Sequence, residues 1–546
     1  MKTPRCLSRL VHFSVVAGIC WLGGCETSLA ADRTWFGGGS DGKWSDPANW
    51  SSTPKTNGVD YLRFADAPVT ETWNDFEDAA FLGIIYREAA PTFILNGNGI
   101  VLEGNYGIRN NSSSHQIINI GIQVTSSTTY LQAGSGQLTF NGVISGTGSL
   151  SFQGSNHAVN LNGANTISGG ITLSTNLTLR LGHSQAAGTG VFQMSGGTLI
   201  FGGGITHFSM GGISGSGPFA LEDENGNGVF LTLVGSGSYS KGGALSGKGG
   251  LIVNLAPEGY QALTGANTFT GGVTLNSGTL DINGGSAALS ASTALTVNGG
   301  SLLITRGNNR TITVAEFNGT GGELVANTAS DDTKYLATLV VNTTTENRYE
   351  GNIRDGVGIF AITKSGTGSL TLSGSNTYTG ATTVNAGTLR IEGQLTNSNV
   401  SVAAEGTLGG DGGRIGGSLT MANNSAFEFT LGNSAEAGLS IHELSLGSNV
   451  NLKLALGRTV SGGEVFTLIE TDLEILGTIA RINGSTYTIG DSFYLEYLGQ
   501  QYELKLVATD TSYSVVVIPE PGAQMLIGLA AAGMLALRRR RFHVSL

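Results

Sequence analysis

The sequence predicts an all-β protein in which short parallel strands stack rung on rung as a coiled solenoid. Short phrases recur along the chain, each phrase alternates apolar and polar residues, and Gly or Asn residues bound it. This pattern is typical of repeated strands joined by tight turns, and no helical pattern separates the phrases. Glycine supplies 86 of the 546 residues without a three-residue period. A tight coil needs Gly and Asn at its corners, because a positive φ angle penalises a Cβ atom.

Three recurring phrases define the repeat. The first phrase reads GTGSLSFQGS at 146–155 and GTGSLTLSGS at 366–375. The second reads GANTISGGITL at 163–173, GANTFTGGVTL at 265–275 and GSNTYTGATTV at 374–384. The third reads GTLIF at 197–201, GTLDI at 278–282 and GTLRI at 387–391. In this third phrase we expect Leu280 and Ile282 to point inward, with Asp281 between them facing out.

One asparagine recurs in register in the second phrase, as Asn165, Asn267 and Asn376. We interpret these residues as turn asparagines or inward-facing ladder asparagines that cap backbone groups. A ligand-binding role is the alternative. We expect the repeats to occupy residues 71–424. About 360 repeat-like residues at roughly 20–25 per coil predict ~15–18 rungs and a rod of ~70–90 Å, since rungs lie ~4.8 Å apart.

The N-terminus predicts a signal peptide over residues 1–30. Basic residues precede an apolar stretch at 10–22, and small residues before Ala30 favour cleavage between Ala30 and Ala31. A competing signal is LGGC at 22–25, which looks like a lipoprotein box and would lipidate Cys25. All three cysteines lie in this leader, so cleavage leaves a chain without disulfides that depends on its core and its backbone ladders.

The opening of the exported body, residues 31–70, contains Trp35, Trp44 and Trp50. We expect these three rings to cover the first rung, because the ends of a solenoid must be closed against edge pairing. The alternative is a platform on which sugars stack.

Residues 425–517 differ from the repeats because glycine is sparser and the expected strands are longer. Clear alternation in YLEY at 494–497 and ELKL at 503–506 supports this reading. The expected strands are 450–456, 464–470, 492–498, 502–507 and 512–517. The region predicts either a terminal β-sandwich or closing rungs that cap the solenoid.

The C-terminal residues 518–546 predict a sorting tail. Pro519, Glu520 and Pro521 precede an apolar span at 522–537, which is shorter than the ~20 residues that cross a bilayer comfortably. The span ends in four arginines, Arg538, Arg539, Arg540 and Arg541. The positive-inside rule leaves these arginines in the cytoplasm and the body across the membrane. A motif, an anchor and a basic stop indicate a processed signal, and a simple tail-anchor helix is the alternative.

Two resemblances follow from these residues. The tail resembles the PEP-CTERM sorting signal, which implies recognition by an exosortase-type membrane protease and delivery to the cell surface or extracellular matrix of a Gram-negative-type bacterium. The repeats resemble the autotransporter-associated β-strand repeat, strongly at 365–393, well at 263–285 and more weakly at 145–173. That resemblance implies a single-stranded, right-handed parallel β-helix. Autotransporters end in a membrane β-barrel, whereas this tail predicts a passenger-like body on another export route.

We expect no catalysis and no cofactor. The histidines of the body, such as His442, are scattered without ligand spacing, and His442-Glu443 lacks the second histidine of a zinc motif. No nucleophile elbow in a strand-to-helix context and no phosphate loop is present. A net charge of -11 without basic stripes argues against nucleic-acid binding.

The strongest metal candidate is the segment EDENGNG at 222–228. Asp223, Asn225 and Asn227 place oxygen ligands at alternate positions as in the first half of a calcium loop. Val234 stands where the closing glutamate of that loop is expected. An acidic surface turn without a metal is therefore the favoured interpretation.

Together these features predict a non-enzymatic, exported β-solenoid that acts as an adhesin or a matrix scaffold. Extracellular polysaccharide is the expected ligand, and the tail would hold the protein in the membrane before processing. A polysaccharide-active lyase or hydrolase on the same fold is the main alternative. A passive surface-layer component without a ligand is the third.

Overall fold

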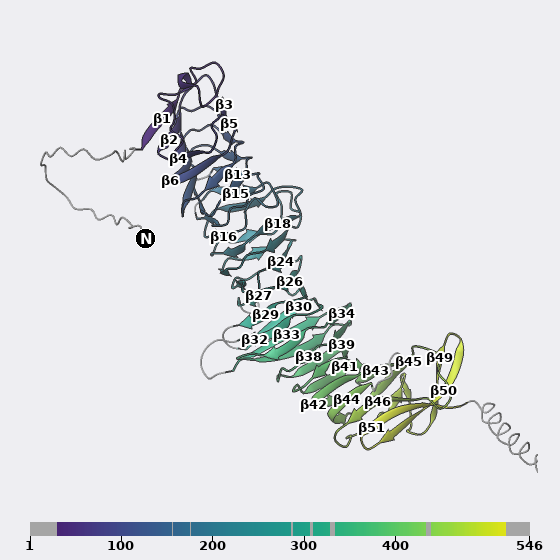
Figure 1. Cartoon of the computed structure of the whole chain (residues 1–546). Helices are drawn as coiled ribbons and strands as arrows, with labels where there is room; N and C mark the ends of the chain where they lie inside the picture. The colour runs from purple at the N-terminus through teal and green to yellow at the C-terminus, as the bar shows by residue number, and fades with distance from the viewer. Residues whose placement is uncertain are drawn as a thin grey trace, which may run out of the picture.

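The computed structural model describes residues 30–519 except 155–156, 175, 285–287, 306–308, 328–333 and 433–437. These residues form a parallel β-solenoid of about 17 turns, and their only helix is a 3-10 turn, η1 (Pro47–Asn49). The predicted all-β solenoid is therefore confirmed. Figure 1 shows the coils stacked into a long rod, with the N-terminal strands at one end and the last strands at the other.

Two parallel sheets form the faces of the first coils. The first sheet contains β1 (Ala31–Trp35), β2 (Asp60–Phe64), β4 (Ala79–Tyr86), β6 (Ile100–Asn110), β8 (Ile122–Val124), β9 (Thr129–Ala133), β11 (Ile144–Ser145), β12 (Leu150–Gly154), β14 (Ile171–Leu173), β16 (Val191–Met194) and β19 (Gly212–Ser214). The second contains β3 (Glu71–Asn74), β5 (Ile94–Gly97), β7 (Gln116–Ile118), β10 (Leu138–Phe140), β13 (Ala158–Leu161), β15 (Thr178–Leu181) and β17 (Thr198–Phe201).

The middle coils continue in three further parallel sheets. One contains β18 (His207–Met210), β21 (Phe230–Leu233), β24 (Gly250–Asn254), β26 (Val273–Ser277), β28 (Ala294–Val297) and β31 (Glu316–Asn318). Another contains β22 (Ser238–Lys241), β25 (Tyr260–Leu263), β27 (Thr279–Ile282), β29 (Ser301–Thr305), β32 (Glu323–Asn327) and β35 (Asn352–Asp355). The short third sheet pairs β20 (Phe219–Ala220) with β23 (Leu245–Ser246).

The remaining strands belong to one continuous sheet that closes the rod. Its parallel part contains β30 (Arg310–Val314), β33 (Leu336–Asn342), β34 (Glu346–Tyr349), β36 (Ile359–Ser365), β37 (Ser369–Leu372), β38 (Ser375–Asn376), β39 (Thr382–Ile391), β40 (Gln394–Leu395), β41 (Val400–Gly410), β42 (Gly413–Met421), β43 (Ala426–Leu431), β44 (Leu439–Leu446) and β45 (Asn451–Leu456). Its last strands are β46 (Val465–Thr471), β47 (Arg481–Ile482), β48 (Ser485–Thr486), β49 (Ser492–Tyr497), β50 (Gln500–Thr509) and β51 (Ser512–Val517).

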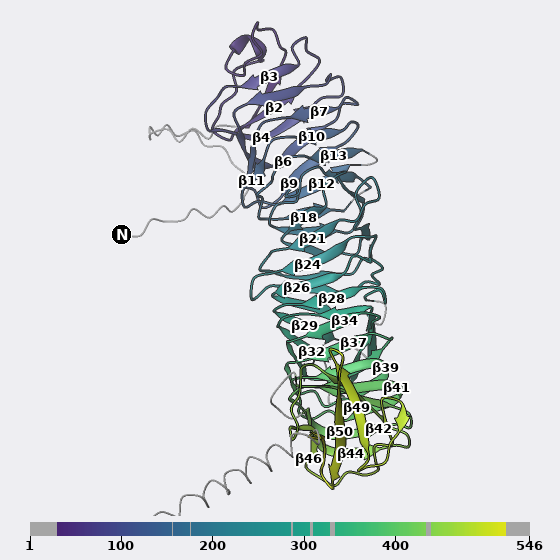
Figure 2. The same cartoon turned by 90° about the vertical axis from the view of Figure 1, so that its right-hand side faces the viewer.

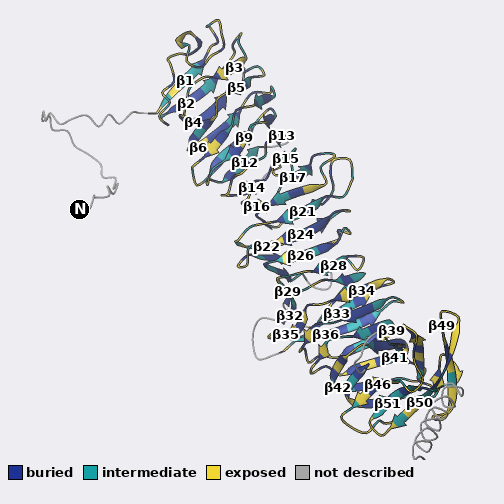
Figure 3. Cartoon of the chain, turned by 45° about the vertical axis from the view of Figure 1, so that its right-hand side comes forward, coloured by how far each residue is buried: buried dark blue, intermediate teal, exposed yellow. Residues whose placement is uncertain are grey.

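Strand alternation builds the core as the sequence predicts. Leu280 pairs with Leu302 in the next coil, so this coil takes 22 residues, and both side chains are buried. Figure 3 shows buried residues alternating with more exposed ones along the strands. One expectation is wrong: Asp281 does not face solvent but is only 1% exposed. Tyr260 and Thr305 from the adjacent coils cover its carboxylate.

The N-terminal end is closed by aromatic side chains. Trp35, Trp44 and Trp50 are at most 5% exposed. Their rings pack edge to face around Trp50, with centroids 5.0 and 6.1 Å apart, and Phe64 lies beneath them. Asp46 accepts a hydrogen bond from Ala48 N and so caps η1, which carries Trp50 over the first coil. Because the rings are buried, they offer no stacking face to a sugar.

The C-terminal end is closed by a change of strand direction. Parallel coils extend beyond the expected boundary at residue 424, because β43 pairs with β45 and β44 with β46 in parallel. β51 then inserts between β46 and β50 in antiparallel pairing, and β49 completes the hairpin. Figure 2 shows β49 and β50 running across the last coils. The region thus combines closing rungs with an antiparallel cap.

Candidate functional site

The repeated asparagines lie inside the solenoid. Asn165, Asn267 and Asn376 are at most 3% exposed. The Oδ1 atom of Asn267 accepts a hydrogen bond from Leu245 N (2.9 Å) in the preceding coil, and its Nδ2 donates to Ala288 O (2.8 Å) in the next. Asn165 bridges three coils in the same way, and Asn376 accepts from the backbone of the preceding coil. These amides satisfy buried backbone groups and present nothing to a ligand.

The calcium candidate is a tightly bonded turn. Asp223 Oδ1 accepts hydrogen bonds from the backbone N–H groups of Asn225 (2.9 Å) and Asn227 (2.8 Å). Its Oδ2 accepts from Gly204 N (3.1 Å) and from Asn227 Nδ2 (3.2 Å). These hydrogen bonds lower the pKa of Asp223 to about 2, and the bond from Asn227 N contributes most. N–H donors therefore occupy the carboxylate positions that a cation would need, and within the described residues no three His, Cys, Asp or Glu side chains cluster as a metal site.

The histidines contact local neighbours. His442 Nδ1 lies 3.1 Å from Asp472 Oδ2, and this hydrogen bond lowers the pKa of the exposed Asp472 carboxyl. His115 instead lies against Thr139, with Nε2 and Oγ1 2.8 Å apart. His207 stacks on the Phe230 ring, with centroids 5.5 Å apart. These contacts place the imidazoles in separate parts of the rod.

A buried carboxylate cluster was not predicted from the sequence. Asp281 accepts hydrogen bonds from the hydroxyl groups of Tyr260 and Thr305 and from Asn283 Nδ2 (3.3 Å). Burial, together with the bond to Asp281, raises the pKa of Tyr260. The cluster ties three coils together, because Tyr260, Asp281 and Thr305 lie on β25, β27 and β29.

Two buried lysines were also not predicted from the sequence. Lys241 and Lys364 are 0% exposed, and burial lowers the pKa of each to about 8. Lys364 Nζ donates to three turn carbonyls, those of Ser365 (2.8 Å), Gly366 (2.9 Å) and Ala386 (3.2 Å). Lys241 Nζ donates to Gly217 O and lies 5.1 Å from the centre of the Phe219 ring. Both ammonium groups cap backbone carbonyls at corners of the coil.

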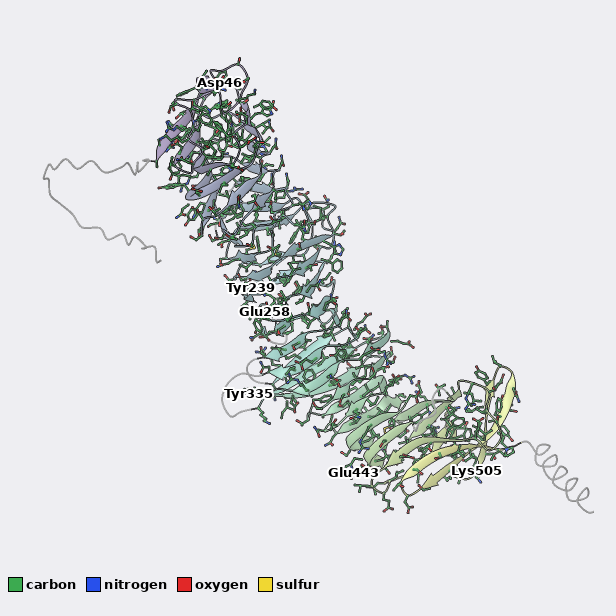
Figure 4. All side chains as sticks on the ribbon, in the orientation of Figure 1. Asp46, Tyr239, Glu258, Tyr335, Glu443 and Lys505 are labelled. Carbon is green, nitrogen blue, oxygen red and sulfur yellow. The ribbon has the colours of Figure 1, made fainter. Side chains whose placement is uncertain are left out.

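The outer faces carry polar side chains along the whole rod, from Asp46 near one end to Lys505 near the other (Figure 4). One row of exposed asparagines hydrogen-bonds from coil to coil at 2.7–2.8 Å. Its members are Asn96, Asn119, Asn141 and Asn162. A second such row contains Asn254, Asn276 and Asn298.

An open hollow of about 590 Å³ lies on the outer surface of the first sheet. Its lining includes Val101, Gln123 and Ser145, which lie side by side on β6, β8 and β11. Glu77 and Asp78 also line it. The hollow is open and mixed in polarity.

The folded body ends directly at the sorting motif. Val517 N donates to Glu464 O (2.9 Å), and Ile518 N donates to Glu503 O (2.8 Å). Pro519, the first residue of the motif, follows at once, so no spacer separates the last paired strand from it. At the other end β1 begins at Ala31, the residue after the expected cleavage point at Ala30.

The remaining signal residues lie outside the part of the chain that the structure describes. These are residues 1–29 of the leader and, in the tail, Glu520, Pro521, the span 522–537 and the arginines at 538–541. Among the described residues, no helix has the length and apolar character needed to cross a membrane.

Comparison with protein families gives two matches. Residues 258–282 and 362–391 match the passenger-associated-transport-repeat, and residues 517–541 match the PEP-CTERM protein-sorting motif. The weaker copy at 145–173 is not among the matched residues. Comparison with curated proteins and with solved structures gave no match. The chain therefore carries passenger-type repeats and a PEP-CTERM motif, which indicate an exported, surface-associated protein of a Gram-negative bacterium, processed by an exosortase.

Proposed function

We propose that this exported β-solenoid acts without catalysis, as an adhesin or a scaffold at the cell surface or in the extracellular matrix. This proposal rests on the regular spacing of polar side chains on the outer faces of the coils. In one row, Thr232, Thr274 and Thr296 occupy the same register position on β21, β26 and β28, with Ile252 between the first two. The rungs repeat every ~4.8 Å.

Such rows favour weak contacts repeated many times along a polymer. Each contact adds little affinity, but contacts that engage together raise the overall avidity. Extracellular polysaccharide is a polymer with the required repetition and hydroxyl groups. The same long surface would also serve as a scaffold between neighbouring cells.

The route to the surface forms the second part of the proposal. The span at 522–537 would hold the protein in the inner membrane until an exosortase-type protease acts near Pro519. Removal of the tail would release the body into the matrix. The signal peptide at 1–30 would start this route by directing export.

Incubation with a panel of polysaccharides tests the absence of catalysis. We expect binding without chemical change. Release of reducing ends or of unsaturated sugars would instead identify a hydrolase or a lyase. Deletion of the gene should reduce cell adhesion or matrix cohesion, and an unchanged deletion strain would favour a passive surface layer.

A further inference from the structure

Six side chains form a tyrosine–arginine surface on the outer face of the first coils. They are Tyr61, Arg63, Tyr106, Arg109, Tyr130 and Gln132. They lie on β2, β6 and β9, and β4 lies between β2 and β6 in the first sheet. Figure 2 shows these strands one below the other near the N-terminal end.

Strand register aligns five of these residues in two outward rows, and Tyr106 lies beside the first row, next to Gly107. In the first row Tyr61 pairs with Gly83, and Gly83 pairs with Gly107. Ile108 pairs with Leu131, so the preceding residues, Gly107 and Tyr130, lie opposite each other. Two glycines thus lie between two tyrosines. A Cβ atom at Gly83 would lie 3.5 Å from the Tyr61 ring and 2.7 Å from Gly107 O, so no larger residue fits at this position of the row.

The second row brings charge beside the rings. Arg63 pairs with Ile85, Ile85 with Arg109, and Arg109 with Gln132. The row lies two residues further along each strand, so its side chains emerge on the same face as the tyrosines. Its two guanidinium groups are separated by one coil, and that of Arg63 is bound to the Asp32 carboxylate. Arg109 is therefore the arginine of this row that could bind a further carboxylate.

The rings and the guanidinium group contact one another directly. The Tyr61 and Tyr106 rings meet edge to face, with centroids 5.5 Å apart at 89°. Arg109 Cζ lies 4.7 Å from the centre of the Tyr106 ring. Tyr106 is nevertheless 51% exposed. In the described part of the rod before residue 465, the only other aromatic side chains more than 40% exposed are Phe36 and Trp73.

Arg109 differs in its partners from four outward arginines further along the rod. Arg180, Arg348, Arg354 and Arg390 each bind a glutamate across the outer face. Within the described residues Arg109 has only the Tyr106 ring, and its Nε atom is buried without a hydrogen-bond acceptor. On a chain with a net charge of -11, this guanidinium group lacks the carboxylate that it would bind.

We propose that the tyrosine–arginine surface binds an acidic polysaccharide, with a sugar carboxylate on Arg109 and sugar rings against Tyr61, Tyr106 and Tyr130. This inference rests on the proposed function and specifies its ligand class and its site. Aromatic rings offer apolar faces to the C–H groups of sugars, and a guanidinium group binds a carboxylate through two parallel hydrogen bonds. The surface from Tyr61 to Tyr130 spans three rungs, about 14 Å, which suits a chain rather than a single sugar.

A single-stranded nucleic acid is the other polymer that tyrosine and arginine side chains can bind. The overall charge and the sequence pI of about 5.2 oppose a polyphosphate backbone, which needs a long basic groove. A polysaccharide carries hydroxyl groups on every sugar, and the Gln132 amide can both donate hydrogen bonds to them and accept hydrogen bonds from them. The acidic glycan is therefore the favoured ligand.

Affinity electrophoresis of the whole exported protein in gels that contain polygalacturonate tests the proposal. We expect retardation of the native protein and at least about tenfold weaker binding for Tyr106→Ala and for Arg109→Gln. Arg109→Lys, which keeps the charge but loses the planar fork, should recover part of the affinity. Methyl-esterified polygalacturonate, which lacks the charge, should bind much more weakly than the free acid.

Matched controls separate the site from general effects. Tyr494→Ala removes a 57% exposed tyrosine in the C-terminal cap, and Arg481→Gln removes an exposed arginine there. Both should bind as the native protein does. Native binding that survives Tyr106→Ala and Arg109→Gln would overturn this site but leave the proposed function standing. No binding to any polysaccharide would overturn both, and preference for a single-stranded oligonucleotide would identify the wrong ligand class.

Discussion

The two ends of the solenoid are closed by different means. At the N-terminal end Trp35, Trp44 and Trp50 cover the first coil with buried rings. At the C-terminal end β51 reverses the strand direction and pairs with both β46 and β50. Inner coils hydrogen-bond to a coil on each side, whereas an end coil has one neighbour and an open edge. One end therefore depends on a few large side chains, and the other depends on backbone pairing.

This difference predicts different sensitivities. A truncated side chain should damage the N-terminal end most, whereas loss of a backbone N–H should damage the C-terminal end most. Because coils contact only their neighbours, each defect should remain local.

Trp44→Ala should destabilise the first coils by about 3–5 kcal/mol, because a large core ring is removed. Trp44 is 0% exposed, and its Nε1 donates to Thr72 Oγ1 (3.0 Å). Denaturant unfolding followed by tryptophan fluorescence measures the loss. The control is Trp73→Ala: this side chain is 41% exposed, and its loss should cost about 1–2 kcal/mol, clearly less than Trp44→Ala. Equal effects of the two substitutions would contradict a side-chain cap.

Val515→Pro should open the C-terminal sheet at a cost of about 3 kcal/mol, because proline removes a ladder N–H from a central strand. Val515 pairs with Phe466 on one side and with Leu506 on the other. Hydrogen exchange should show faster exchange in β46 and β50. Val515→Ala, which keeps the N–H, should cost about 2 kcal/mol and leave these amides protected. Retained protection in the proline variant would show that backbone pairing does not close this end.

Asn267→Ala should destabilise an inner coil by about 1–3 kcal/mol, because it leaves Leu245 N–H buried without an acceptor. The matched control is Asn276→Ala, which removes an exposed ladder amide and should cost about 0.5 kcal/mol or less. Chemical denaturation of both variants makes the comparison. A larger loss for Asn276→Ala would contradict the inward role of the repeat asparagine.

Lys364 should give an inner coil a pH-dependent stability. Burial lowers its pKa to about 8 in the folded protein, whereas an unfolded lysine titrates near ~10.4. Between these values the unfolded chain binds more protons, so the lysine should make unfolding harder as the pH rises from about 8 to ~10. Relative to Lys364→Met, the native protein should gain about 2 kcal/mol over that range. If the free energy of unfolding changed equally with pH in both proteins, burial would not disfavour the charged form of Lys364.

The sequence predicts the coils far better than the features between them. Period-two alternation correctly predicts that Leu280 and Ile282 lie in the core, because alternate side chains of a strand point to the same face. The same alternation wrongly predicts that Asp281 is exposed. The pattern of one strand does not show which side chains of the neighbouring coils cover a residue on its outer face. Lys364 was missed for the converse reason: an inward lysine is recognisable only once the carbonyls around it are placed.

The tyrosine–arginine surface was also beyond the reach of the sequence. Tyr61 and Tyr130 are 69 residues apart in the sequence, and only the register of β2, β4, β6 and β9 places them in one row on the same face. Coil lengths vary, so a change of one residue in any coil would move a tyrosine to the other face. The sorting motif required no register, because it is read as a linear sequence.

Mass spectrometry of both termini of the mature protein, combined with cell fractionation, tests most directly that this solenoid is a sorted surface protein. The folded limits predict a chain that begins at Ala31 and ends close to Pro519–Pro521, in the surface or extracellular fraction. An intact C-terminus with Arg538 to Leu546, found in the inner-membrane fraction, would contradict processing and would identify a tail-anchored protein.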